Sequence, residues 1–184
     1  LEALLLGADL AEKAAKAGIR ALGAGDMGIA NTTPSTALYC ALLDLDPAEV
    51  AGPGTGLDRA GVGRKAGIVA QALEANAAAV AGRDPLAVLA ALGGLEIACL
   101  AGLVLGGAAC GLVVCLDGFI STAAYAAARA ICPRVSGYCV LSHASAEPGH
   151  ALAVERLGLE PVLDLGMRLG EGTGAALVLS LIHI

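Results

Sequence analysis

The residues best suited to chemistry in the first part of the chain lie between Gly25 and Ser35, in the sequence GDMGIANTTPS. They are small, hydroxylated and amide residues that follow a short apolar run, and Pro34 stands where a helix can begin. Glycine allows backbone conformations that other residues avoid, and Thr33 is a suitable N-cap. Because free N–H groups at a helix start can bind phosphate, the stretch predicts an anion-binding turn. The alternative is a capped strand-to-helix loop without a ligand.

Polar side chains also follow three apolar runs in the second half of the chain. The runs are 112–116, 137–141 and 161–165, and helices are expected to begin after them near Ile120, Pro148 and Thr173. Strand–helix alternation implies a parallel sheet with right-handed crossovers, and such sheets bind ligands beyond the carboxyl ends of their strands. The residues at those ends are 117–122, 142–147 and 168–174. We therefore expect most chemistry-capable side chains of this half to gather at one edge of the sheet.

At and just after the second of these strand ends, three side chains have a spacing that suggests a metal site, H-x3-E-x2-H. They are His143, Glu147 and His150. Pro148 and Gly149 interrupt the helical spacing that would align them, and no fourth ligand lies within reach in the sequence. Capping and hydrogen bonding are the favoured roles, so no metal is expected.

Two other catalytic patterns are disfavoured. No G-x-S-x-G elbow is present for a nucleophilic serine. Residues 23–28 match G-x-G-x-x-G, but no acidic residue ends a second strand about twenty residues later, as a dinucleotide site requires. We therefore expect no redox cofactor.

The first half of the chain is predicted to be mostly helical. The expected elements are a helix at Ala8–Ala17, a strand at Ile19–Leu22, a helix from Pro34 to about Asp44, a helix at Arg59–Val80, a helix capped by Asp84 and a helix beginning at Leu95. Lys65 lies near the start of its helix, where the dipole disfavours a cation. A solvated position is the interpretation that the sequence favours for it, and a nearby anion is the alternative.

Composition limits the class of protein. A hydrophobic content of 57% with 15% charged residues supports a large core, and one Phe and three Tyr leave it to be built from Ala, Leu, Val and Ile. The net charge of −6 argues against nucleic acid as a partner. Six cysteines form no CxxC pair, and no signal peptide is recognised at the start, so a cytoplasmic location is expected.

Residues 97–116 carry no charge and are long enough in principle to cross a membrane, with Gly102 and Gly106 forming GxxxG. Acidic residues flank the run and neither Lys nor Arg anchors its ends. A buried helix followed by a buried strand is therefore predicted, with no membrane partner.

Six motifs, in order along the chain, resemble one family. They are GDMGIANTTPS at 25–35, GTGLD at 54–58, GGLEIA at 93–98, LDGFIST at 116–122, SAEPGH at 145–150 and LDLGMRLGEGTGAAL at 163–177. The chain is similar to the nicotinate-nucleotide:dimethylbenzimidazole phosphoribosyltransferase family, which makes the lower nucleotide of cobalamin. The resemblance implies phosphoribosyl transfer from nicotinate mononucleotide to 5,6-dimethylbenzimidazole, giving α-ribazole 5′-phosphate and nicotinate, without a cofactor. A non-catalytic fragment that only binds nucleotide phosphate is the alternative.

The resemblance also assigns roles to residues. It implies that Glu171 is the general base and that Asp26 is a second carboxylate. The implied substrate and phosphate contacts are Gly28, Asn31, Thr32, Thr33, Lys65, Asp117, Ser121, Leu169 and Gly170. Asp26 stands where the family usually has glutamate, and Ala30 replaces a common glycine. The shorter acid at position 26 reaches less far toward the ribose or the base.

The expected fold is a three-layer α/β domain with a mostly parallel, Rossmann-like sheet and helices on both faces. Residues 1–184 are expected to be a single catalytic core, a fragment that lacks the N-terminal region and the C-terminal end of the family. Residues 178–184 are a candidate non-native tail. The full-length protein is expected to be a homodimer.

Overall fold

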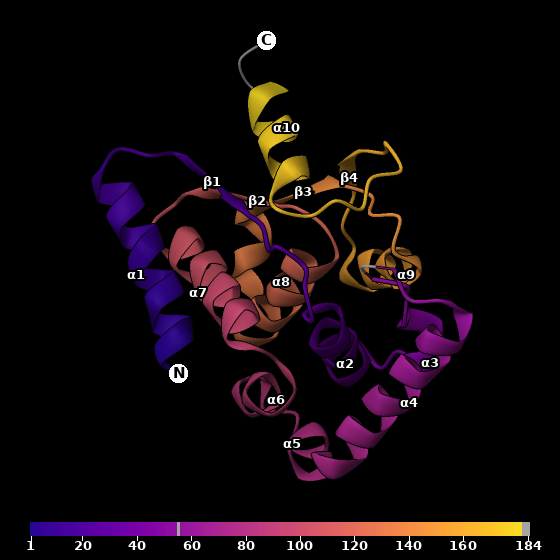
Figure 1. Ribbon diagram of the computed structural model, residues 1–184. Helices are drawn as coiled ribbons and strands as arrows, with labels where there is room; N and C mark the ends of the chain where they lie inside the picture. Colours follow the sequence, from indigo (N-terminus) through magenta and orange to yellow (C-terminus); the bar gives the residue numbers. More distant parts are fainter. Residues whose placement is uncertain (55, 182–184) are drawn as a thin grey trace.

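The computed structural model describes residues 1–54 and 56–181. Its centre is one sheet of four parallel strands in the order β1-β2-β3-β4 (Figure 1). The strands are β1 (Ala21–Ala24), β2 (Val113–Leu116), β3 (Cys139–His143) and β4 (Pro161–Leu163). The predicted α/β fold with a parallel sheet is confirmed.

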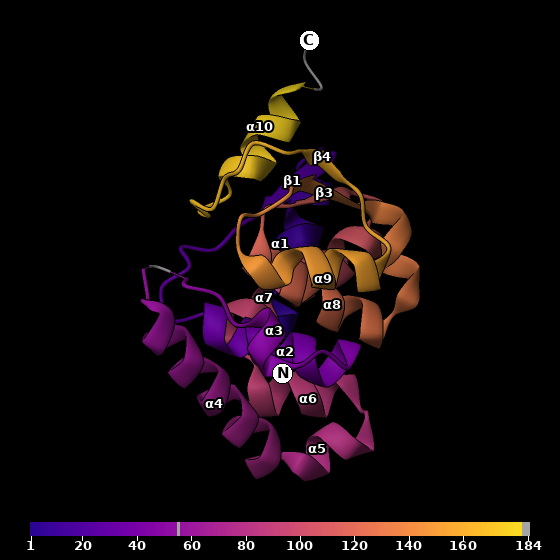
Figure 2. The ribbon, with the colours of Figure 1, turned by 90° about the vertical axis from the view of Figure 1, so that its right-hand side faces the viewer.

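Helices cover both faces of this sheet. They are α1 (Glu2–Lys16), α2 (Thr32–Leu43), α3 (Pro47–Val50), α4 (Arg59–Ala75), α5 (Ala77–Gly82), α6 (Pro85–Leu92), α7 (Leu95–Ala109), α8 (Phe119–Ile131), α9 (Pro148–Leu157) and α10 (Thr173–Leu181), with a 3₁₀ turn η1 at Pro133–Tyr138. Because the strands follow one another in sequence order, right-handed crossovers place their connecting helices on a single face. Among the helices of the described residues, only α10 lies on the opposite face (Figure 2).

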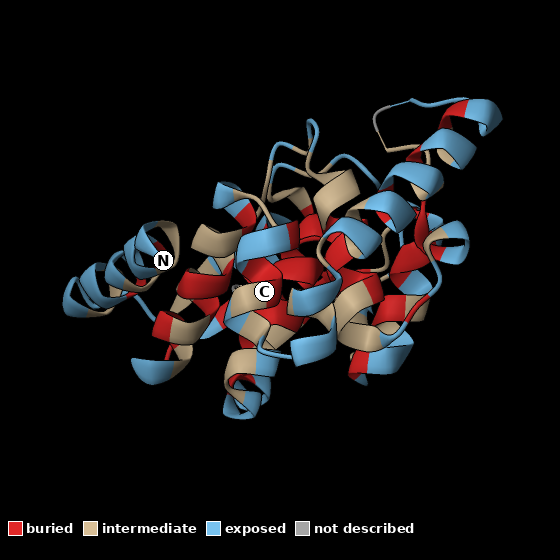
Figure 3. Cartoon of the chain, turned by 90° about the horizontal axis from the view of Figure 1, so that it is seen from below, coloured by how far each residue is buried: buried red, intermediate tan, exposed pale blue. Residues whose placement is uncertain are grey.

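The core lies between the sheet and the helices on its crowded face. Buried residues are concentrated in the middle of the molecule, and the outer helices are largely exposed (Figure 3). Helix α8 is the most buried element, since every residue from Phe119 to Ala128 is buried. Its many alanines let neighbouring helices approach closely, and the Tyr39 hydroxyl of α2 donates to the Phe119 carbonyl at 2.6 Å. These contacts hold α8 directly beneath the end of β2.

The uncharged segment 97–116 forms α7 and then β2, as predicted. Its glycines allow α1 to pack against α7: a Cβ at Gly102 would overlap the carbonyl oxygen of Leu4, and one at Gly106 would press on Ala8. The GxxxG spacing is therefore a helix-packing feature within the domain. No helix in the described part of the chain has both the length and the apolar character needed to cross a membrane.

Several predicted boundaries are wrong. Helix α1 begins at Glu2, the helix expected at Arg59–Val80 divides at Asn76, and β1 lies about two residues later than expected. Residues 178–181 belong to α10, and Val178 packs against Cys115 of β2. The rest of the candidate tail, 182–184, lies outside the described residues.

Candidate active site

A cleft of about 540 Å³ opens at the carboxyl ends of the four strands. It is lined by Asp26, Met27, Gly28, Thr32, Gly54, Asp117, Gly118, Phe119, Ile120, Ser121, Glu147, Arg168, Leu169 and Gly170. These residues come from the segments that follow β1, β2, β3 and β4, together with the start of α2 and the bend at Gly54. Parallel strands bring those segments to one edge, as the alternation of elements predicted.

The segment after β1 is folded back on itself by Asp26. Its carboxylate accepts hydrogen bonds from the Gly28 N–H at 2.7 Å and from the Asn31 side-chain amide at 3.2 Å. Ala30 has a φ of 64°, a left-handed conformation that glycine adopts more easily. A glycine, which the resemblance leads us to expect at this position, would adopt this conformation without strain.

Helix α2 begins differently from the prediction. It starts at Thr32 with Asn31 as the N-cap residue, so the expectation that Thr33 caps it is wrong. Asn31 already has helical dihedral angles, and its carbonyl accepts the first helical hydrogen bond, from the Ser35 N–H at 3.1 Å. Its side chain is bonded to Asp26, so it does not cap the helix.

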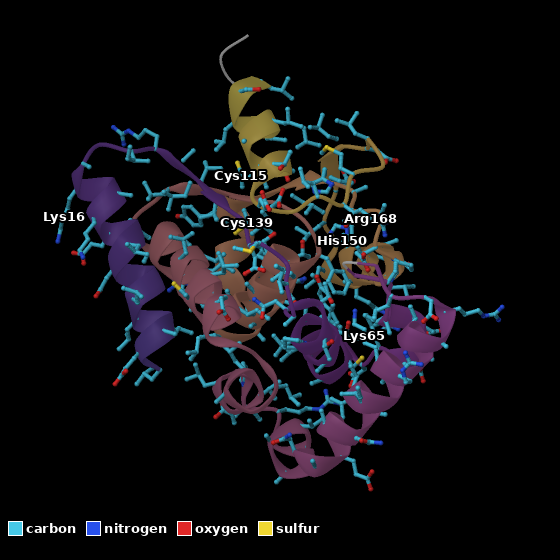
Figure 4. The ribbon with its side chains drawn as sticks, viewed as in Figure 1. Lys16, Lys65, Cys115, Cys139, His150 and Arg168 are labelled. Atoms are coloured by element: carbon cyan, nitrogen blue, oxygen red, sulfur yellow. The ribbon has the colours of Figure 1, made fainter. Side chains whose placement is uncertain are left out.

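Lys65 is buried, which overturns the interpretation that it is solvated. Only 4% of its surface is exposed, and its ammonium group donates to the Thr32 hydroxyl at 3.0 Å and to the Gly52 carbonyl at 3.1 Å. Figure 4 shows Lys65 pointing inward from α4, whereas Lys16 extends from α1 into solvent. Burial lowers the pKa of Lys65, and the nearby charge of Glu147 partly opposes that shift. A buried cation therefore lies directly behind the Thr32 wall of the cleft.

Glu147 also lines the cleft. Its side chain is 6% exposed and accepts a hydrogen bond from the Gly54 N–H at 3.3 Å. A Cβ at Gly52 would overlap the Glu147 carboxylate, so a larger residue there would displace this side chain. The contact joins the start of α9 to the glycine-rich bend, whose residue 55, within the GTGLD motif, lies outside the described residues.

The two histidines near Glu147 are held by hydrogen bonds. The Ser145 N–H donates to Nδ1 of His150 at 3.0 Å, so the proton of the neutral ring lies on Nε2. Nε2 then donates to the Thr122 hydroxyl oxygen at 3.1 Å. Burial lowers the pKa of His150 to about 4, with a smaller effect from His143. His150 is therefore neutral and fixes the loop that carries Glu147. In the described part of the chain, no group of three or more His, Cys, Asp and Glu side chains is arranged to hold a metal ion.

The turn GEGTG, at residues 170–174, lies beside the cleft. Glu171 has a φ of 60°, and the flanking Gly170 and Gly172 have φ values of 80° and 78°. The Glu171 N–H donates to the Asp26 carbonyl at 2.8 Å, which joins this turn to the segment after β1. Glu171 and Asp26 together border a second, more open hollow that adjoins the cleft.

Asp117 lies between the two regions. Its carboxylate is buried and accepts hydrogen bonds from the Gly172 and Gly174 N–H groups. The hydroxyl of Ser121, in the first turn of α8, donates a hydrogen bond to the Gly118 carbonyl at 3.1 Å. Both residues therefore line the cleft and at the same time stabilise its frame.

The structure brings most of the predicted site residues together. Those lining the cleft are Asp26, Gly28, Thr32, Asp117, Ser121, Leu169 and Gly170. Glu171 borders the adjoining hollow, Asn31 and Lys65 support the cleft from behind, and Thr33 lies in the first turn of α2 without lining it.

Two cleft residues had no specific role in the sequence-based interpretation. Glu147 was considered only as a metal ligand or a cap, and Arg168 only as part of a strand end. Figure 4 shows Arg168 and His150 in the same region, near α9. The available signals were their positions after strands β3 and β4 and within the motifs at 145–150 and 163–177.

Comparison with known proteins supports the family resemblance that the six sequence motifs indicated. The phosphoribosyltransferase family model DBI_PRT matches residues 1–184. The chain is 71% identical over 181 residues to nicotinate-nucleotide--dimethylbenzimidazole phosphoribosyltransferase of Solidesulfovibrio magneticus, covering 98% of this chain and 51% of that protein. It is 60% identical over 182 residues to the protein of the same name from Nitratidesulfovibrio vulgaris strain DP4, covering 99% of this chain and 51% of that protein.

A solved structure has the same fold. The crystal structure of CobT from Thermus thermophilus matches with a TM-score of 0.89 and 44% identity, covering 98% of this chain and 53% of that one. The chain thus spans about half the length of the curated relatives it matches. With the family model matched along its whole length, the chain belongs to the nicotinate-nucleotide:dimethylbenzimidazole phosphoribosyltransferase family.

Proposed function

We propose that the full-length protein transfers the phosphoribosyl group of nicotinate mononucleotide to 5,6-dimethylbenzimidazole or a related base. The products are α-ribazole 5′-phosphate, which is an intermediate of cobalamin biosynthesis, and the released nicotinate. Family membership and the cleft at the strand ends support this proposal. The chain contributes the core of the catalytic domain, residues 1–184, and no metal or other cofactor takes part.

The reaction sets one main chemical demand. As the bond from the ribose carbon to the pyridinium nitrogen breaks, its electron pair stays on nitrogen, and nicotinate leaves as a neutral ring. A benzimidazole nitrogen forms the new bond to that carbon, and the proton on its other nitrogen must be removed. A carboxylate beside the base is suited to accept that proton.

One observation carries the assignment of Glu171 as that base. Three other carboxylates around the cleft, those of Asp26, Asp117 and Glu147, accept hydrogen bonds from main-chain N–H groups. Among the described residues, no hydrogen bond to the Glu171 carboxylate is found, so it is free to accept a proton. Its left-handed backbone supports the assignment, since such strain concentrates at functional sites. Asp26 is assigned an orienting role.

The phosphate of the nucleotide is proposed to bind at residues 28–33. The Gly28 N–H is already bonded to Asp26, so the binding groups are the remaining N–H groups of the loop, the Thr32 or Thr33 hydroxyl and the cation of Lys65. Asn31, Ser121, Leu169 and Gly170 complete the substrate contacts. Crystals soaked with nicotinate mononucleotide should show the phosphate at this loop, and a phosphate bound elsewhere would refute this placement.

The proposed base can be tested in a full-length chimera, the Solidesulfovibrio magneticus relative with its matched residues replaced by this chain. Glu171→Gln keeps size and polarity but removes the proton acceptor. Turnover should fall by about 10²–10⁴-fold, with a small change in KM for nicotinate mononucleotide. Asp26→Asn should have a milder effect, because its amide oxygen can still accept from the Gly28 N–H.

The control for this test is Asp44→Asn, an exposed residue paired with Arg83 far from the cleft. Unchanged turnover in Glu171→Gln would refute the assignment of the base and make Asp26 the next candidate. The unmodified chimera also tests the non-catalytic alternative, since a chimera that binds nicotinate mononucleotide without releasing nicotinate would favour it.

The full-length protein is further proposed to be a cytoplasmic homodimer. All six cysteines are free, and burial raises the pKa of Cys40 and Cys139 to about 12, which keeps those thiols protonated. Free thiols are typical of a reducing compartment. Exposed leucines on α1 provide apolar surface for association. Light scattering of the chimera would measure its oligomeric state, and a monomer would refute the dimer.

A further inference from the structure

Asp117 makes two hydrogen bonds to a turn far away in the sequence. Its Oδ2 accepts from the Gly172 N–H at 3.0 Å and its Oδ1 from the Gly174 N–H at 2.7 Å. The Asp117 side chain is 3% exposed, so water competes little for these bonds. Both oxygens are therefore bonded to the turn that carries Glu171.

The same turn is held from a second side by the segment after β1. The Glu171 N–H donates to the Asp26 carbonyl at 2.8 Å. Gly25 packs so closely on Gly172 that a Cβ on Gly25 would overlap its main chain. Three N–H groups of the turn are thus fixed by residues that follow two different strands.

Asp117 is itself fixed in place. The Ser142 hydroxyl donates to its carbonyl at 2.8 Å, and Nε2 of the buried His143 lies 3.6 Å from its Oδ1. Its own N–H donates to the Ala24 carbonyl at 3.1 Å, within the ladder between β1 and β2. The position of the carboxylate is therefore set by the sheet.

We propose that Asp117 is a positioning residue that anchors the GEGTG turn and thereby places the Glu171 carboxylate for proton transfer. The inference rests on the proposed function of Glu171. A left-handed glutamate between two glycines persists only when its surroundings hold it, and a carboxylate accepting two N–H groups is a strong anchor. A displacement of about 1 Å at a catalytic group can cost about 10²-fold in rate.

The change Asp117→Asn in the full-length chimera tests this role. Asparagine has the same shape, but its amide nitrogen cannot accept a hydrogen bond, so one of the two N–H groups loses its partner. We expect turnover to fall by about 10–100-fold, with KM for nicotinate mononucleotide changed by less than about 3-fold.

A double-mutant cycle separates positioning from other roles. In the Glu171→Gln background, Asp117→Asn should cause little further loss of turnover, because the placed base is already absent. Direct substrate binding by Asp117 would instead raise KM, and its effect would add fully to that of Glu171→Gln. Either result would overturn the proposal. Asp44→Asn is again the matched control, with no expected effect in either background.

Amide hydrogen exchange tests the anchor without a variant and without activity. In the unmodified chain, the Gly172 and Gly174 amides should exchange at least about 10-fold more slowly than expected for an unprotected turn. Fast exchange of both amides would refute the anchor even if Asp117→Asn failed to fold. Normal turnover of Glu171→Gln would refute the proposed base and the catalytic consequence, whereas the exchange rates would still decide whether Asp117 holds the turn.

Discussion

At the scale of single residues, the partners of each charged group decide what it can do. Three carboxylates around the cleft accept hydrogen bonds from main-chain N–H groups, namely those of Asp26, Asp117 and Glu147. Among the described residues, none donates a hydrogen bond to the Glu171 carboxylate. Lys65 contributes its charge from behind Thr32. The acidic residues around the cleft therefore differ in their hydrogen-bond partners, and this difference is the reason that we propose a chemical role for Glu171.

The buried His150 predicts a specific dependence of stability on pH. Its pKa in the folded protein is about 4, below the ordinary value of 6.5. Between these two pH values the unfolded chain binds a proton that the folded chain does not, so stability falls as pH falls from about 6.5 to about 4. The loss attributable to His150 should be at most roughly 3 kcal/mol.

Chemical denaturation of the chain at several pH values would measure this effect. Carboxylates also titrate near the lower end of the window, so the informative quantity is the difference between the unmodified chain and His150→Gln. The variant should show a flatter decline. Equal declines in the two proteins would mean that His150 does not contribute.

At the scale of elements, the sequence predicted the strands and their order of appearance well, because each apolar run is bounded by glycine, proline or polar residues. It did not reveal the burial of Lys65. That burial depends on the Gly52 carbonyl and the Thr32 hydroxyl, which come from two other segments. The start of α2 was misplaced because proline was taken as the first helical residue. The helix begins at Thr32, and the Asn31 carbonyl already accepts its first hydrogen bond.

The candidate site likewise has features that could be predicted from the sequence and features that could not. The position of the cleft at the carboxyl edge of the sheet, and most of the residues that line it, could be predicted from the alternation of strands and helices. The anchor from Asp117 to Gly172 spans 55 residues, and no local pattern encodes it. The role of Glu171 came from the resemblance of its motif to a family, and the structure adds its left-handed backbone.

Replacement of glycine by alanine is expected to have opposite effects at two positions, one in the contact between α1 and α7 and the other in α4. Gly102→Ala places a methyl group against the carbonyl oxygen of Leu4, so the helices must separate, and we expect a loss of about 1–3 kcal/mol. Gly67→Ala is the matched control, because Gly67 lies inside α4 with open space around it. It should gain about 0.5–1 kcal/mol, since glycine is unfavourable within a helix. Urea denaturation measures both, and a destabilising Gly67→Ala or a neutral Gly102→Ala would contradict this account of the contact.

At the scale of the whole molecule, many large apolar side chains are exposed. On α1, the side chains of Leu5, Leu6 and Leu10 are 50%, 53% and 47% exposed, and Leu95 at the start of α7 is 76% exposed. Leu6 and Leu10 lie one turn apart on the same side of α1. Contiguous apolar surface of this kind promotes association between molecules.

We therefore expect the isolated chain to associate as its concentration rises and to bind a hydrophobic dye. Light scattering should show the apparent mass increasing with concentration. The double variant Leu6→Gln/Leu10→Gln should reduce both association and dye binding, because glutamine keeps good helix propensity while removing apolar surface. Glu2→Gln/Glu12→Gln changes two exposed residues of the same helix without changing its apolar face, and it should leave association unaltered or slightly increased. If the unmodified chain stays monomeric and binds no dye, its exposed leucines do not form an association surface, and the support that they give to a homodimer is lost.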